Sequence, residues 1–121
     1  MALKTIRLEL ARSPDFPEGS SRHGYELQAP LLADGHLDEA AWRSRDKAVP
    51  LPVRRFWAGE DDRAGELVHT RHGWAFSYAP GEDDDEALFK LDRHLFRPGE
   101  YVTVTEPGGG PAHTFRVVSI R

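Results

Sequence analysis

The stretch that decides the fold of this chain is PGEYVTVTEPGGGPAHTFRVVSI, which covers residues 98–120. Apolar and polar side chains alternate on both sides of a tip rich in glycine and proline, and a two-residue period is typical of a strand with one buried face. The tip itself cannot continue a strand, because proline lacks an N–H donor and glycine is too permissive. The pattern predicts a C-terminal β-hairpin over about residues 99–120. Four residues are expected to face the core: Val102, Val104, Phe115 and Val117.

The same period recurs through the rest of the chain. It is clearest at residues 4–10, where Ile6, Leu8 and Leu10 fall on one face. The segment 13–24, rich in Pro, Gly and Ser, indicates an irregular loop. Further short strands are expected at 25–29, 53–57, 66–70, 74–78 and 88–91. About seven short antiparallel strands favour a mainly β fold, a small barrel-like or sandwich domain.

One window predicts a helix, at about residues 36–45. Acidic residues stand in its first turn and arginines near its end, which suits the helix dipole. Leu37 and Ala41 are four residues apart and would share its buried face. The prolines at 50 and 52 limit the helix to about two turns. The expected architecture is therefore a β domain with one short α-helix.

Size and composition limit the classes of function. A chain of 121 residues, 39% hydrophobic and 30% charged, fits one domain spanning residues 1–121. It contains no cysteine, which excludes thiolate metal sites and cysteine nucleophiles and fits a reducing compartment. Its N-terminal residues lack the apolar run of a secretory signal, so the expected location is cytoplasmic, with no membrane association. A net charge of −4 makes nucleic acid an unlikely partner.

Two groups of residues are the candidates for a ligand or partner surface. His69 and His72 lie at the end of an expected hairpin beside Trp74, close to carboxylates that could share a metal or cofactor. No HExxH motif is present, and the acidic run at 82–86 lacks the alternate spacing of a calcium loop. The sequence therefore predicts neither a metal nor another cofactor.

The second group belongs to the basic segment 43–57, in which Arg54 and Arg55 precede an aromatic pair that ends at Trp57. Basic residues beside exposed rings can hold single-stranded nucleic acid. The plainer interpretation is internal, with the basic strand lying near the acidic loops of the same domain.

Two short stretches resemble known families. DGHLDEAAW, at residues 34–42, resembles the DGxLDExxW signature that opens family 9 carbohydrate-binding modules, which implies sugar binding. FRPGEYVTV at 96–104, with RVVSI at 116–120, is similar to elements of the flavin-binding barrel of ferredoxin-reductase-like enzymes. A Val stands where that second motif has Tyr, so this resemblance implies a barrel more than a flavin. Neither assigns the chain to a family.

We expect a non-catalytic binding or interaction module, with no catalytic residues assigned and an unknown protein or small molecule as its ligand. One alternative is a metal- or cofactor-binding enzyme that uses His and carboxylates near the Trp74–Tyr78 hairpin. The other is a single-stranded nucleic-acid binder that uses the segment 43–57. An open sheet edge would favour a homodimer.

Overall fold

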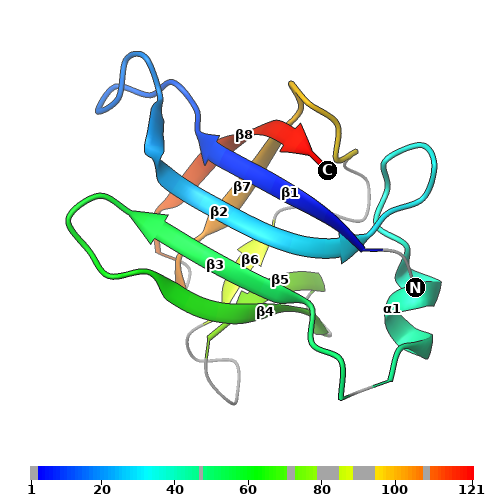
Figure 1. The fold of residues 1–121 in the computed structure, drawn as a ribbon. Helices are drawn as coiled ribbons and strands as arrows, with labels where there is room; N and C mark the ends of the chain where they lie inside the picture. The colour runs from blue at the N-terminus through cyan, green and yellow to red at the C-terminus, as the bar shows by residue number, and fades with distance from the viewer. Residues whose placement is uncertain (1–2, 47, 71–72, 79–84, 89–94, 108–109) are drawn as a thin grey trace.

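The structure is a computed structural model that describes residues 3–46, 48–70, 73–78, 85–88, 95–107 and 110–121. It is mainly β, with one short helix, as the sequence predicts (Figure 1). The elements in chain order are β1 (Leu3–Leu10), β2 (Ser20–Pro30), α1 (Glu39–Ser44), β3 (Pro52–Trp57), β4 (Arg63–Thr70), β5 (Gly73–Ser77), β6 (Glu86–Leu88), β7 (Tyr101–Thr105) and β8 (Ala112–Ile120).

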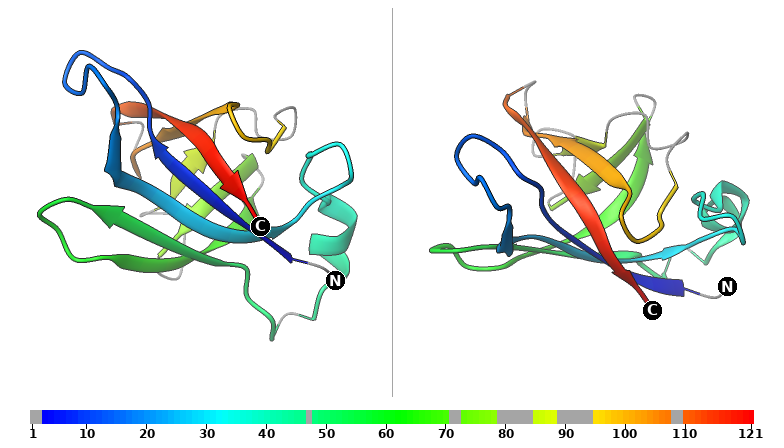
Figure 2. Two further views of the ribbon diagram at one scale, coloured as in Figure 1. Left: turned by 45° about the horizontal axis from the view of Figure 1, so that its top comes forward. Right: turned by 90° about the horizontal axis from the view of Figure 1, so that it is seen from above.

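The strands form a closed, up-and-down antiparallel barrel. Each strand pairs with the next along the chain, and β8 returns to pair with β1. Seen from above, β7 and β8 run steeply across the direction of β2 and β3 (Figure 2). The narrowest join is β6, which has only three residues and pairs through Glu86 and Ala87 with β5 and through Ala87 and Leu88 with β7. Every described strand has two neighbours, so the open edge on which the predicted homodimer depended is not found among them.

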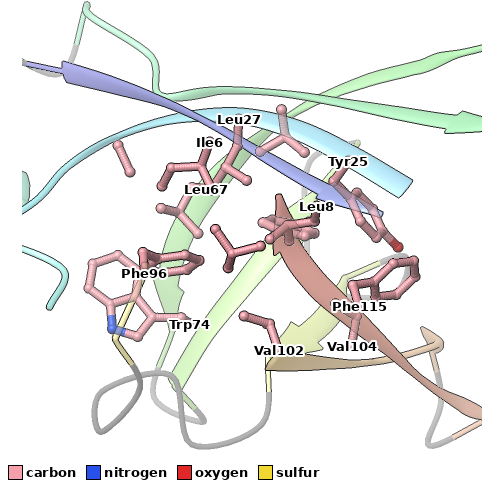
Figure 3. Packing of buried hydrophobic residues seen from close by; sticks show 14 of the residues in the cluster. Ile6, Leu8, Tyr25, Leu27, Leu67, Trp74, Phe96, Val102, Val104 and Phe115 are labelled. Atoms are coloured by element: carbon pink, nitrogen blue, oxygen red, sulfur yellow. The ribbon is translucent and has the colours of Figure 1, made fainter. Parts of the chain in front are cut away.

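The inner face of the barrel holds the hydrophobic core. The alternation in β1 places Ile6, Leu8 and Leu10 inside, each no more than 5% exposed. The hairpin supplies the opposite wall, and the prediction for its four inward residues is confirmed, since Val102, Val104, Phe115 and Val117 are at most 2% exposed. Phe96, from the segment before β7, enters the same core beside Trp74 (Figure 3).

Helix α1 covers one end of the barrel and begins three residues later than predicted. Asp38 caps it, accepting a hydrogen bond from the backbone N–H of Ala41 at 3.0 Å. Leu37 precedes the helix because it forms a β-bridge with Leu31. Leu37 is buried, but the prediction that it shares a buried helix face with Ala41 is wrong, since no residue of α1 is buried. The helix fixes Trp42 against the barrel core.

The segment 13–24 is only partly an irregular loop, because β2 already begins at Ser20. Glycine within this strand reflects a close backbone approach rather than a turn. A Cβ atom on Gly24 would lie 2.0 Å from the carbonyl oxygen of Leu8 and 3.0 Å from Cζ of Phe56. Only glycine lets β2 pass both neighbours at this distance.

Gly24→Ala is therefore expected to destabilise the barrel by roughly 3 kcal/mol or more, since the clash is with backbone that cannot move without separating β1 from β2. Gly59→Ala is the matched control. Its φ is +86° and nothing lies within 4 Å of the added atom, so the strain of the left-handed backbone alone should cost about 1 kcal/mol. Denaturant unfolding measures both, and equal losses would contradict this account of Gly24.

Candidate functional site

One end of the barrel interior is polar. We call this group, Tyr25, Arg55, Tyr78 and Glu86, the polar end. Glu86 is only 3% exposed; the Tyr78 hydroxyl donates to one of its carboxylate oxygens. Arg55 Nε lies 3.7 Å from the other oxygen. The strand register brings these groups together, because it sets Tyr25 opposite Arg55 and Phe76 opposite Glu86. A carboxylate this deeply buried needs such partners to remain charged.

The two phenols of the polar end keep their protons. Burial raises the pKa of Tyr25 above its ordinary value of 10.0, and the negative charge of Glu86 raises it further. The same two causes, in the same order, raise the pKa of Tyr78. Neither phenol can supply a phenolate near neutral pH, so their role here is to solvate the buried carboxylate.

Aromatic rings border the polar end. Trp57 is the central one: its ring centre lies 4.6 Å from that of His23 and 5.7 Å from that of His113. The Arg55 guanidinium stacks on it at 4.5 Å. Burial lowers the pKa of His23, and the charges of Arg22 and Arg55 lower it further. Because Phe56 and Trp57 are adjacent in a strand, at least one of them is expected to be in the core. In the structure Phe56 is buried, and Trp57 is half-buried and packs against the core.

The basic strand β3 satisfies its charges within the domain. Arg54 contacts Asp62 at 2.9 Å and Glu26 at 3.2 Å, and Arg55 contacts Glu60 at 3.3 Å. Asp62 and Glu60 belong to the acidic segment after β3. The predicted internal complementarity of this strand and the acidic residues is confirmed at these positions. Both arginines are already engaged by carboxylates that a nucleic-acid phosphate would have to displace.

The histidine group lies at the other end of the barrel, beside α1. The His69 ring centre is 4.7 Å from that of Trp74 and 5.8 Å from that of Trp42. Its Nε2 atom lies 3.8 Å from Oε1 of Glu39. His72, the predicted neighbour of His69, lies outside the described residues. The five predicted residues that the structure describes thus fall into two groups, because His69 and Trp74 pack beside the helix while Arg55 and Trp57 lie at the polar end.

A groove on the outside of the barrel is a better candidate for a binding site. It has a volume of about 860 Å³ and lies over the outer face of β8, between the segment 11–21 and the start of β7. We call it the outer groove. Its lining residues are Glu9, Leu10, Ala11, Arg12, Glu18, Gly19, Ser20, Ser21, Tyr101, Thr114, Arg116 and Val118.

Backbone hydrogen bonds hold the wall of the outer groove in place. The Ala11 N–H donates to the Thr114 carbonyl at 2.9 Å, which extends the β1–β8 contact beyond the strand. Ser13 and Phe16 exchange backbone hydrogen bonds, and the Gly19 N–H donates to the Phe16 carbonyl at 2.9 Å. The Phe16 ring contacts His23 at 4.8 Å, which anchors this segment against the barrel. The wall is therefore a hydrogen-bonded structure despite its lack of helix or strand.

The floor of the outer groove is a row of side chains across three strands. The register places Glu9 of β1 opposite Arg116 of β8, and Arg116 opposite Tyr101 of β7. Tyr101 is 54% exposed. Glu9 is engaged by Arg7, whose Nε lies 2.8 Å from Oε2. The row therefore presents an exposed phenol ring next to an exposed guanidinium.

The sequence does not predict the outer groove. The alternation in residues 101–105 and 112–120 marks Tyr101 and Arg116 as outward residues, but nothing in the sequence sets Arg12 beside them. That neighbourhood exists because β8 pairs with β1, which are the two ends of the chain.

The described parts of the chain contain no group of three or more His, Cys, Asp or Glu residues that could hold a metal ion. Within these parts, no helix has the length and apolar character needed to cross a membrane. No protein-family model, curated protein or solved structure matches the chain.

Because of the polar end, the free energy of unfolding is expected to decrease at alkaline pH. Because the pKa of Tyr25 and of Tyr78 is raised in the folded chain, their contribution is complete below the pKa of unfolded tyrosine, about 10. Above that pH it decreases, since the unfolded chain releases protons that the folded chain keeps. Each tyrosine should lower the free energy of unfolding by about 1.4 kcal/mol per pH unit.

Tyr25→Phe should remove one such contribution, and the double variant with Tyr78→Phe should remove both. Urea unfolding at pH 8 and at several values from 10 to 11.5 measures the slopes. The double variant is predicted to lose less stability with rising pH than the unsubstituted chain. Parallel slopes for the two proteins would contradict the burial of these phenols.

Proposed function

We propose that this chain is a non-catalytic binding module that takes a small ligand in the outer groove. The observation that carries the proposal is the groove itself, whose volume of about 860 Å³ falls in the range of about 300–1,000 Å³ common for small-ligand sites. Hydroxyl groups of Ser20, Ser21 and Thr114 line it together with charged and aromatic side chains. Such a mixture can orient a ligand through a few polar contacts. The cytoplasmic location expected from the sequence remains part of the proposal, whereas the expected homodimer has lost its support because no open edge is found among the described strands.

Binding is favoured over catalysis by the surroundings of Ser20. Its Oγ lies 2.6 Å from Nδ1 of His23, a distance at which a histidine could act as base toward a serine nucleophile. The same Oγ accepts a hydrogen bond from the Arg22 N–H at 3.2 Å. The ring of His23 packs between Phe16 and Trp57, rather than against a carboxylate that would orient it. These contacts fit a hydrogen bond that fixes the start of β2.

Amide chemical shifts measured against a library of small metabolites test the proposal. At least one compound should cause saturable shifts at residues 20, 21 and 114. Ser21→Trp should weaken that compound at least tenfold, since Ser21 is exposed and its new side chain would fill the groove. Gln28→Trp adds the same side chain at another exposed position of β2 and should leave binding unchanged.

A library that shifts no groove residue, or whose compounds bind Ser21→Trp as well as the unsubstituted protein, would show that the outer groove is not the site.

A further inference from the structure

We infer that the ligand of the outer groove is a small organic anion with a planar ring, whose carboxylate or phosphate group binds Arg12 and Arg116 and whose ring stacks on Tyr101. The inference rests on the proposed function of the groove and adds the chemical class of its ligand. The inference is based on which arginines of the described residues have an acceptor within the chain and which do not.

Most described arginines already have an acceptor. Those paired with carboxylates are Arg7, Arg43, Arg54, Arg55 and Arg121. Arg45 and Arg97 donate to backbone carbonyls, and Arg63 stacks on Tyr78. Among the described residues, the arginines with neither a hydrogen-bond acceptor nor an ion-pair partner are Arg12, Arg22 and Arg116.

These three arginines are not scattered. Arg12 and Arg116 line the outer groove, and Arg22 follows the lining residue Ser21 in the chain. Among the described residues, the guanidinium groups without an acceptor are therefore found in the outer groove or next to it in the chain. A guanidinium group offers a planar set of donors that fits a carboxylate or a phosphate. The outer groove is therefore lined by two guanidinium groups, those of Arg12 and Arg116, that have no acceptor among the described residues.

The carboxylates of the groove do not cancel this charge. Glu9 is held by Arg7 at 2.8 Å, which leaves Glu18 as the opposing group on the wall. Glu18 is exposed and belongs to the segment between β1 and β2. An anion between Arg12 and Arg116 would experience two positive charges against one.

Tyr101 supplies the second part of the ligand specificity. It is directly opposite Arg116 in the β7–β8 register, and its side chain is 54% exposed. An exposed aromatic ring on a sheet is a stacking platform for a planar group. An anionic group held by Arg116 would place an attached ring over Tyr101.

The charge of the whole chain limits the size of the anion. The net charge is −4, so a long polyanion would be repelled at distances where the two arginines act weakly. A small anion meets the arginines at contact distance and carries little charge beyond them. The observations thus favour a small molecule over a nucleic-acid strand.

The test uses four probes and amide chemical shifts at moderate salt. Phenyl phosphate and benzoate carry a ring with a phosphate or a carboxylate, benzyl alcohol carries the ring alone, and inorganic phosphate carries the charge alone. Phenyl phosphate and benzoate should shift residues 20, 21, 114 and 116 saturably, with dissociation constants of roughly millimolar size. Benzyl alcohol and inorganic phosphate should each bind at least several-fold more weakly, because each lacks one of the two contacts.

Variants assign the contacts. Arg12→Gln and Arg116→Gln should each weaken phenyl phosphate roughly tenfold. Arg43→Gln removes the same charge from α1, outside the groove, and should change the affinity by less than about twofold. Tyr101→Ala should weaken binding roughly threefold to tenfold, whereas Tyr101→Phe keeps the ring and should retain it.

The outcomes separate this inference from the proposed function. If benzyl alcohol binds as tightly as phenyl phosphate, or if Arg43→Gln is as harmful as Arg116→Gln, the anionic class is wrong. If inorganic phosphate binds as tightly as phenyl phosphate, the ring is not recognised. If no aromatic anion binds but another compound does, and Ser21→Trp blocks that compound, the groove remains a binding site for a different class of ligand. A groove to which nothing binds overturns both.

Discussion

The pairing of β8 with β1 is the constraint on which the rest of this structure depends. These strands come from the two ends of the chain, and the backbones of Thr5 and Arg121 exchange hydrogen bonds at 2.8 and 2.9 Å. Without this contact the sheet would have two open edges with unpaired N–H and C=O groups. With it, every strand gains two neighbours, and the sheet acquires an inside and an outside. The alternation of each strand then assigns its side chains to one or the other.

Closure also explains why a charged group can lie inside the barrel. Removing Glu86 from water is costly, and the gain from its partner at 3.7 Å offsets that cost only in part. The Tyr78 hydroxyl supplies the remaining stabilisation directly. Because Arg55 lies in β3 and Glu86 in β6, with two strands between them in the sheet, these two groups meet only when the sheet has curled. The polar end thus forms only when the barrel closes. It also favours the correct strand register, since another register would leave the buried carboxylate of Glu86 without its hydrogen-bond donor.

Much of the fold could be predicted from local pattern, and the exceptions have physical causes. Ile6, Leu8 and Leu10, like Val102 and Val104, are predictable because a two-residue period directly encodes a buried face. The sequence does not predict the start of β2, because Gly24 is typical of a turn, whereas in the structure glycine is required there by the close approach of Leu8 and Phe56. The predicted start of α1 is too early because the β-bridge between Leu37 and Leu31 is a contact that helical periodicity does not encode.

The residues of the candidate sites are harder to predict for the same reason. The sequence indicates a candidate site at Arg54, Arg55 and Trp57, because basic and aromatic residues are adjacent there. Their order in the chain does not show which carboxylates pair with the two arginines in the fold. Tyr101 is the neighbour of Arg116 within the β7–β8 hairpin. Arg12 lies almost ninety positions before Tyr101, and it joins these two residues only through closure of the barrel.

Most described arginines of this domain have an acceptor within the same chain. An arginine without such an acceptor is therefore a candidate for contact with a ligand. Surface ion pairs contribute little to stability, so pairing alone does not show that an arginine is structural. What matters is position: the arginines paired with carboxylates lie in β1, β3 and α1 and just after β8, where a carboxylate of the fold is within 4 Å. Arg116 has such a carboxylate opposite it in the register, that of Glu9, but Arg7 occupies it instead. The carboxylate opposite Arg116 is thus already engaged by Arg7, and among the described residues Arg116 has no acceptor beside Tyr101. That arrangement contributes nothing evident to the stability of the barrel, but it leaves a guanidinium group and a ring positioned for a ligand from outside.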